Sequence, residues 1–131
     1  MIRRRWPLIL LGASVASLLG CGVGGAPTNG VVEAVNLSRA SASFHWQSPG
    51  LLGMPLFGAT GTEPIGPCGS YVRSFGAGDQ AITIGSATTS RSFILQAPAE
   101  GPQAELIIVI TADGGITSVD RDHVPPSPFC P

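Results

Sequence analysis

Lysine is absent from this 131-residue chain, and only 11% of its residues are charged. A basic stripe that would follow the phosphates of a nucleic acid is therefore missing, which argues against nucleic-acid binding. Without lysine the chain cannot use a Schiff-base lysine or the Ser-x-x-Lys pair of some hydrolases. It also lacks a Gly-x-Ser-x-Gly motif, so the sequence shows no recognised hydrolytic nucleophile.

Long helical patterns are scarce as well, whereas turn-forming residues are frequent. The chain has 18 Gly and 12 Pro, and 44% of its residues are hydrophobic. This composition suits short strands joined by many turns better than long helices. The length allows one modest hydrophobic core, so we expect a single all-β domain.

The N-terminus carries the three parts of an export signal. Arg3, Arg4 and Arg5 precede the apolar run from Leu8 to Leu19, and Gly20 follows as a small residue. A positively charged start, a short apolar segment and a small-residue cleavage site are the features of a secretory signal peptide. The apolar run has about a dozen residues, fewer than the ~20 that a membrane-spanning helix needs.

The end of this segment, Leu18-Leu19-Gly20-Cys21, resembles the lipobox of bacterial lipoproteins. The resemblance implies that a diacylglycerol is attached to the sulfur of Cys21 and that the chain is cleaved before this residue. The mature protein would then be exported and anchored on the extracytoplasmic side of the cell membrane or the outer membrane. The alternative is an ordinary secretory signal, which would leave Cys21 unmodified and the protein freely secreted.

A glycine-rich stretch follows Cys21. Residues 22–30 contain four glycines and one proline, a composition typical of a flexible tether. We therefore divide the chain into a signal peptide (1–20), a lipidated cysteine with its tether (21–30) and a β-sandwich domain (31–131). Beyond Cys21 four arginines face eight acidic residues, so this part carries a net charge of −4.

Residues 40–47 alternate strictly between two kinds of side chain. The apolar residues from Ala40 to Trp46 fall on one face, and polar residues, His45 among them, fall on the other. This period of two predicts a half-buried strand.

Six further segments have strand-like composition between turn residues. Residues 104–111 are apolar on both faces and should form a central strand, which Asp113-Gly114-Gly115 should turn into a strand at 116–120. About seven short strands predict a small two-sheet β-sandwich, immunoglobulin-like or related, with a small barrel as the alternative. The other predicted strands are 31–37, 70–75, 80–85 and 92–96.

Cys68 and Cys130 are the two cysteines that remain when Cys21 is lipidated. In an oxidising extracytoplasmic space, an even pair is most simply a disulfide. It would close a loop of about 60 residues, stabilise the fold by roughly 4 kcal/mol in the chain-entropy model, and hold the Pro-rich tail 124–131 against the domain. A metal or redox pair is the alternative, but neither cysteine lies in a Cys-x-x-Cys arrangement.

His45, Asp120, Asp122 and His123 are candidate ligands or catalytic groups. Three of them lie within the four-residue sequence Asp-Arg-Asp-His, and imidazole and carboxylate groups bind metal ions or act as acid and base. The spacing matches no established metal motif, and charged groups at strand ends are common. We therefore predict no metal, no cofactor and no catalytic residue, with these four residues kept as an alternative.

The longest stretch without strand patterning is 48–67. Structureless segments of this length are uncommon unless they are functional or disordered. Its apolar side chains would form a partner-binding patch if exposed, or cap an open end of the sandwich if buried. The residues concerned are Leu51, Leu52, Met54, Leu56 and Phe57.

The sequence thus predicts a membrane-anchored envelope lipoprotein whose domain is a non-catalytic binding or structural module. Its expected partners are the membrane, through the N-terminal lipid, and an envelope protein or small-molecule ligand. Two alternatives stay open. One is a metal-dependent or hydrolytic envelope enzyme that uses His45, Asp120, Asp122 and His123, and the other is a secreted solute-binding or adhesive protein whose long loop forms the ligand site.

Overall fold

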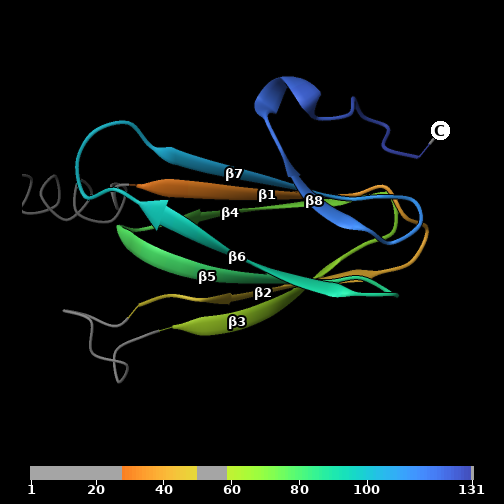
Figure 1. Cartoon of the computed structure of the whole chain (residues 1–131), viewed down its shortest axis with the longest axis horizontal. Coiled ribbons are helices and arrows are strands. Elements are labelled where there is room, and N and C mark those ends of the chain that lie inside the picture. The colour runs from red at the N-terminus through yellow and green to blue at the C-terminus, as the bar shows by residue number, and fades with distance from the viewer. Residues whose placement is uncertain (1–27, 50–58, 131) are drawn as a thin grey trace, which may run out of the picture.

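Eight strands form two four-stranded sheets that pack face to face (Figure 1). The computed structural model describes residues 28–49 and 59–130, and the eight strands lie within these two ranges. The prediction of a small all-β sandwich is confirmed, with eight strands in place of about seven. The strands are β1 (Gly30–Asn36), β2 (Ala42–Gln47), β3 (Thr60–Ile65), β4 (Ser70–Phe75), β5 (Gly78–Gly85), β6 (Ser90–Ala97), β7 (Ala104–Ile110) and β8 (Ile116–Val119).

The strand order is β4-β1-β7-β8 in sheet A and β3-β2-β5-β6 in sheet B. The pair β1 and β7 is parallel, and all other pairs in these sheets are antiparallel. The first two strands lie in different sheets, whereas an immunoglobulin domain pairs its first two strands in one sheet. The fold is therefore a related sandwich and not the immunoglobulin connectivity.

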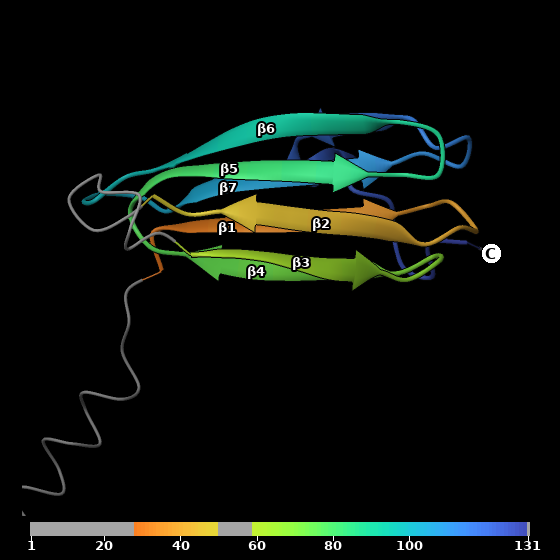
Figure 2. The same ribbon diagram turned by 90° about the horizontal axis from the view of Figure 1, so that it is seen from below.

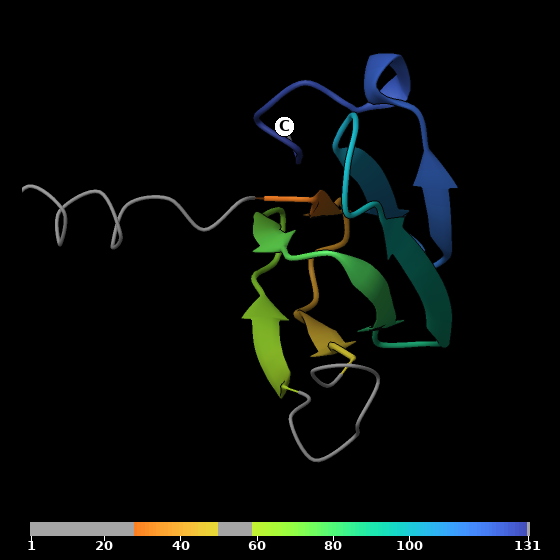
Figure 3. The same ribbon diagram turned by 90° about the vertical axis from the view of Figure 1, so that its left-hand side faces the viewer.

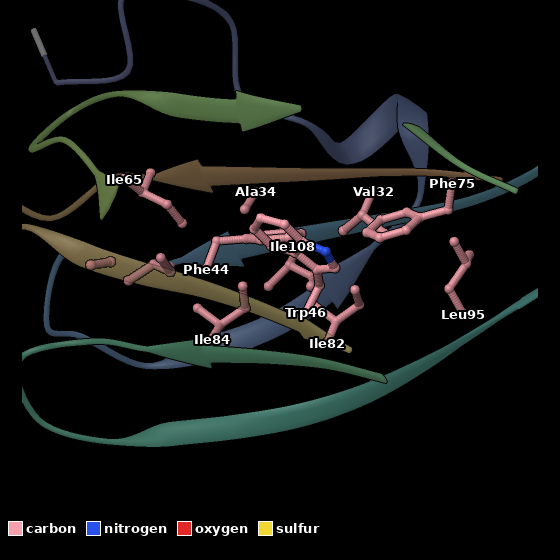
Figure 4. Packing of buried hydrophobic residues seen from close by; sticks show 12 residues of the cluster. Val32, Ala34, Phe44, Trp46, Ile65, Phe75, Ile82, Ile84, Leu95 and Ile108 are labelled. Atoms are coloured by element: carbon pink, nitrogen blue, oxygen red, sulfur yellow. The ribbon is translucent and has the colours of Figure 1, made fainter. Parts of the chain in front are cut away.

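The hydrophobic core lies between the sheets and confirms the faces predicted for residues 42–47. The predicted strand began too early, because Ala40 lies before β2 and is exposed. Ala42, Phe44 and Trp46 are buried, whereas His45 is exposed on the other face of the strand. Phe44 packs on Tyr71 of sheet A with ring centroids 4.9 Å apart. The close view shows the aromatic rings of β2 surrounded by aliphatic side chains from both sheets (Figure 4), which is the arrangement that removes most apolar area from water.

Strand β3 lies inside the segment 48–67, for which we predicted no regular structure, so that prediction is wrong for residues 60–65. The strand was hidden because its sequence contains Gly61 and Pro64, both of which weaken a strand pattern. A side chain on Gly61 would overlap the indole of Trp46, so glycine is needed for this close approach. Proline is tolerated because β3 is an edge strand of sheet B.

Strand β7 is an inner strand of sheet A, as its sequence predicts, and the predicted hairpin with β8 is confirmed. The outer face of sheet A is also buried over β1 and β7, since Val35, Ile107 and Val109 point away from the core and are at most 5% exposed. The chain after β8, beginning with the 3-10 helix η3 (Arg121–His123), crosses this face (Figures 1 and 3).

Polar contacts hold this C-terminal segment, residues 120–130, on sheet A. Arg121 binds Glu33 of β1 at 2.7 Å and Glu105 of β7 at 2.6 Å. At the other end of the segment, the sulfur of Cys130 lies 3.2 Å from the carbonyl oxygen of Leu37. The segment therefore runs along β1 and covers the apolar residues on its outer face.

The strand directions create two ends, which we call the N-terminal pole and the loop pole. The N-terminal pole contains residues 28–29, 76–77 and 98–103, and Asn29 is fixed there by backbone hydrogen bonds with Phe75 and Ala104. The loop pole contains residues 37–41, 66–69, 86–89 and 111–115. The side view shows the chain entering β1 at one end and the tight turns gathered at the other (Figure 2).

Candidate functional site

The predicted disulfide between Cys68 and Cys130 is present. It joins the β3–β4 turn to the C-terminal segment across 62 residues, with the two Cα atoms 5.3 Å apart. The bond therefore fastens the segment to the loop pole, as predicted for the Pro-rich tail. The alternative of a metal or redox pair finds no support in this pairing.

Two other predicted features fall outside the described residues. They are the lipidation site Cys21 and the apolar loop residues Leu51, Leu52, Met54, Leu56 and Phe57. Among the described residues, no helix has the length and apolar character needed to cross a membrane.

The structure does not assemble the four polar residues proposed for the alternative enzyme. His45 lies on the outer face of sheet B, where its Nδ1 is 2.8 Å from Thr62 Oγ1. The remaining three lie together after β8, with potential ligand atoms within 4.8 Å of one another. His45 belongs to a different sheet and is not part of this cluster, so the predicted four-residue centre is incomplete.

A groove of about 480 Å³ lies beside that cluster, between the start of β7 and the end of β8. Asp120, Asp122 and His123 are all exposed, and His123 Nδ1 is 3.4 Å from Asp122 Oδ1. Exposed groups of this kind keep their hydration, so they give a metal ion little of the desolvated, fixed geometry found in protein metal sites. The groove is lined by Glu105, Leu106, Ile107, Ser118, Val119, Asp120 and His123.

A second groove, of about 410 Å³, lies at the loop pole, and we call it the loop groove. Three connections meet there: the crossing from β1 to β2, the β5–β6 turn and the β7–β8 turn. The lining residues are Ser38, Arg39, Ala40, Ala87, Thr88, Ala112, Asp113 and Gly114. Each of these three connections is short. The positions of the strands that they join therefore determine the positions of the groove walls.

The first wall is fixed by the buried side chain of Asn36 at the end of β1. Its Nδ2 donates to the carbonyl oxygens of Ala40 at 2.8 Å and Gly66 at 3.1 Å. Its Oδ1 accepts from the backbone N–H of Ser38 at 3.0 Å and from the Ser38 hydroxyl at 2.7 Å. Because Asn36 is fully buried, these bonds satisfy groups that would be costly to leave unpaired.

The other two walls are joined to each other through Ser86. The Ser86 hydroxyl donates to the carbonyl oxygen of Gly114 at 2.6 Å, and the Ser86 N–H donates to the Thr89 carbonyl oxygen at 2.8 Å. Gly114 is buried and has a φ of +91°, a conformation that favours glycine. A Cβ at this position would overlap Thr88 Oγ1, so the close contact between the two turns also requires glycine.

The Asp113 carboxylate is oriented by its own turn. Its Oδ1 accepts hydrogen bonds from the Thr111 hydroxyl and, at 3.2 Å, from the Gly115 N–H. The hydrogen bond from Thr111, followed by that from Gly115, lowers the pKa of Asp113 below its ordinary value. The other carboxylate oxygen makes no hydrogen bond within the described part of the chain, and Asp113 is an exposed lining residue of the groove.

Arg39 is the cation of the loop groove. It is exposed, and none of the eight acidic side chains of the protein, all of which lie in described residues, forms an ion pair with it. Arg39 and Asp113 thus give the groove one donor-rich and one acceptor-rich side chain with no net charge. The exposed methyl groups of Ala40, Ala87 and Ala112 provide small apolar surfaces between them.

This groove was not among the features predicted from the sequence. Asp113-Gly114-Gly115 was interpreted correctly as a turn, but the role of Asp113 in the groove depends on loops that are 28 residues apart or more, such as the Ser86–Gly114 contact. Local turn chemistry is visible in a sequence, whereas the meeting of three turns depends on strand order. Comparison of the chain with protein-family models, curated proteins and solved structures gives no match.

Proposed function

We propose that the protein is an exported lipoprotein, anchored on the extracytoplasmic side of a membrane, whose β-sandwich is a non-catalytic binding module. The observation that supports this proposal is that the two poles lie at opposite ends of the strands. The chain enters the domain at Asn29, at the N-terminal pole, whereas the loop groove lies at the other end of the strands. A lipid on Cys21 would therefore leave the groove free to meet a ligand.

The proposed anchor has enough energy for durable attachment. Each buried lipid CH₂ group contributes about 0.8 kcal/mol, so the two acyl chains of a diacylglycerol hold a protein on a bilayer, while one chain alone is only marginal. The sequence between Cys21 and Asn29 has the glycine-rich composition typical of a tether. The lipobox-like sequence that ends at Cys21 supports the anchored form over the freely secreted one.

The non-catalytic assignment is based on how the candidate groups are placed. His45 contacts Thr62 on the outer face of sheet B, away from any acidic partner in the part of the chain that the structure describes. His123 pairs with Asp122 in an exposed position. A nucleophile, a base and an orienting acid held in one desolvated cleft would be expected of a hydrolase, whereas the loop groove offers hydrogen-bonding groups.

Mass spectrometry of the membrane fraction tests this proposal, with Cys21→Ala as the comparison. We expect a native chain that begins at Cys21, carries the mass of a diacylglycerol and lacks two hydrogens for the Cys68–Cys130 disulfide. The Cys21→Ala variant should appear in the soluble extracytoplasmic fraction. A native protein without added lipid would refute the anchor and favour a secreted solute-binding or adhesive protein.

A metal-dependent activity is the second candidate, and the observation for it is the cluster of Asp120, Asp122 and His123. Elemental analysis of protein purified without chelators tests it, together with calorimetric titration by zinc and calcium. Stoichiometric metal that is lost in Asp122→Asn would support this candidate. Absence of metal at stoichiometric level and no heat of binding would remove it.

A further inference from the structure

We infer that the loop groove binds a neutral oligosaccharide, with Arg39, Asp113 and Thr88 as the hydrogen-bonding residues. This inference deepens the proposed binding function by naming the chemical class of the ligand, but it does not depend on the lipid anchor. It is based on the identity of the lining groups, their charge balance and the rigidity of the turns that carry them.

The hydrogen-bonding groups fit the neighbouring hydroxyls of a sugar. Each sugar hydroxyl both donates and accepts, so a groove lined by both donors and acceptors can bind several hydroxyls of one molecule. The guanidinium of Arg39 supplies donors, and the free oxygen of Asp113 supplies an acceptor. Thr88, which also lines the groove, can do either through its hydroxyl.

The apolar groups fit the C–H faces of the same molecule. Ala40, Ala87 and Ala112 line the groove together with the polar side chains and present small methyl groups. Its volume of about 410 Å³ falls in the range of ~300–1,000 Å³ usual for small-ligand sites. Large apolar or aromatic side chains, which would hold a hydrophobic peptide anchor, are absent from this lining.

The charge balance disfavours ionic ligands. One exposed arginine and one carboxylate give the groove no net charge, so a polyanion such as a nucleic acid lacks the several cations that it needs. A free metal cation would meet a single carboxylate oxygen without a further acidic ligand among the lining residues. A polar, uncharged ligand meets no such penalty.

The turns that carry these residues are already in place before binding. Asp113 is held by Thr111 and Gly115, and Gly114 is joined to the β5–β6 turn by the Ser86 hydroxyl. A preformed site avoids the entropy cost of ordering loops on binding. Hydrogen bonds to a sugar can therefore contribute to affinity instead of compensating for loop ordering.

Isothermal calorimetry on the full mature chain tests the inference. The probes are three neutral trisaccharides, tri-N-acetylchitotriose, maltotriose and cellotriose, with a neutral Gly-Ser peptide as the comparison. We expect saturable binding of at least one trisaccharide. Arg39→Gln and Asp113→Asn should each weaken it by about tenfold or more, because each removes one charged hydrogen-bonding partner.

Occlusion of the groove gives a test that does not rely on charge. Ala112→Leu places a larger side chain among the lining residues and should abolish trisaccharide binding. Ala99→Leu, an equal change at an exposed position of the N-terminal pole, should leave binding unchanged, and circular dichroism should show both variants folded. Binding that survives Ala112→Leu, binding of the peptide alone, or no saturable binding of any trisaccharide would overturn the inference.

The outcome is separable from that of the proposed anchor. The same titrations are made on the Cys21→Ala chain, which cannot be lipidated. Trisaccharide binding by this variant would support the groove whether or not the native chain carries lipid. Loss of binding in the unlipidated but folded variant would contradict a site built from Arg39, Asp113 and Thr88 alone.

Discussion

Gly114 is the residue on which the geometry of the loop groove depends most. It combines a positive φ with a backbone so close to Thr88 that a Cβ has no room. Gly101, in the connection from β6 to β7, has a similar φ of +94°, but a Cβ added there would have nothing within 4 Å. A substitution at Gly101 therefore reports only the free-energy cost of a side chain at positive φ. A substitution at Gly114 also includes the cost of atomic overlap.

We predict that Gly114→Ala destabilises the fold by about 2–5 kcal/mol, and Gly101→Ala by about 1–2 kcal/mol. Alanine at positive φ costs roughly 1–2 kcal/mol, and overpacking adds a further 1–3 kcal/mol or so. Urea titration gives both values from the midpoints at constant slope. If both variants lose the same free energy of unfolding, the backbone of Gly114 can move away from Thr88 and the prediction is wrong.

Asp113 should make stability depend on pH at the acid end. Its folded pKa is lowered by the bonds from Thr111 and Gly115, so the ionised form stabilises the fold above the unfolded pKa of about 3.9. This contribution is lost as the pH falls through the folded pKa. We predict that Asp113→Asn loses less stability than the native protein between about pH 5 and about pH 2.

Urea midpoints measured across this pH range test the prediction. Glu100→Gln is the control, because Glu100 is exposed and makes no hydrogen bond among the described residues. The control should follow the native pH dependence. A native profile in Asp113→Asn would mean that the carboxylate is not held by its turn.

At the level of elements, the C-terminal segment acts as a cover for sheet A. Arg121 connects it to β1 and β7, and the disulfide fixes its far end to the β3–β4 turn. Beneath it, Val35, Ile107 and Val109 are buried on the face that sheet A turns away from the core. The C-terminal segment therefore covers these apolar residues in place of a third layer of helices or strands on the outer face of sheet A.

We predict that Cys68→Ser with Cys130→Ser lowers the free energy of unfolding by about 4 kcal/mol, as the chain-entropy model gives for a loop of this length. The released segment should also expose the outer face of sheet A, which a hydrophobic dye and hydrogen exchange in β1 and β7 would detect. Arg121→Gln should have a smaller effect because its ion pairs are largely exposed. An unchanged urea midpoint in the double variant would contradict the prediction.

A strand was predicted correctly where burial alone determines its sequence pattern, and it was missed where a contact with a neighbouring strand determines the residue type. The alternation of β2 and the double-sided apolar character of β7 follow from burial on one or two faces, so the sequence displays them directly. Strand β3 escaped notice because Gly61 is required by Trp46, a residue that lies 15 positions earlier in the chain. In the sequence alone, a glycine that a tertiary contact requires cannot be distinguished from a glycine that ends a strand.

At the scale of the whole molecule, the two poles should differ in their distance from an anchoring bilayer. Strands of about seven residues separate the poles by roughly 23 Å at ~3.3 Å per residue. We predict that a fluorophore on Ala99→Cys transfers energy to acceptors in lipid vesicles more efficiently than one on Ala112→Cys. The unanchored Cys21→Ala background should show little transfer from either position, whereas equal transfer in the anchored protein would contradict the proposed orientation.

The arrangement of the whole molecule was only partly predictable. The two-sheet sandwich and the disulfide followed from composition, alternation and cysteine count, which act on every strand or on the chain as a unit. The loop groove did not follow, because Arg39, Thr88 and Asp113 are brought together by the order of strands in both sheets. The crossing of the C-terminal segment was unpredictable in the same way, since Arg121 finds its partners 88 and 16 residues away.

The parallel pairing of β1 with β7 also determines when the domain can form. Residue 30 pairs with residue 104, and the register continues to residues 36 and 110. The two inner strands of sheet A are therefore 74 residues apart in the sequence. Contacts of such long sequence separation slow folding, because the intervening chain must be closed first. A chain threaded through a narrow pore from its N-terminus cannot complete this sheet until β7 has emerged. If the protein is exported as we propose, sheet A can therefore be completed only after β7 has crossed the membrane.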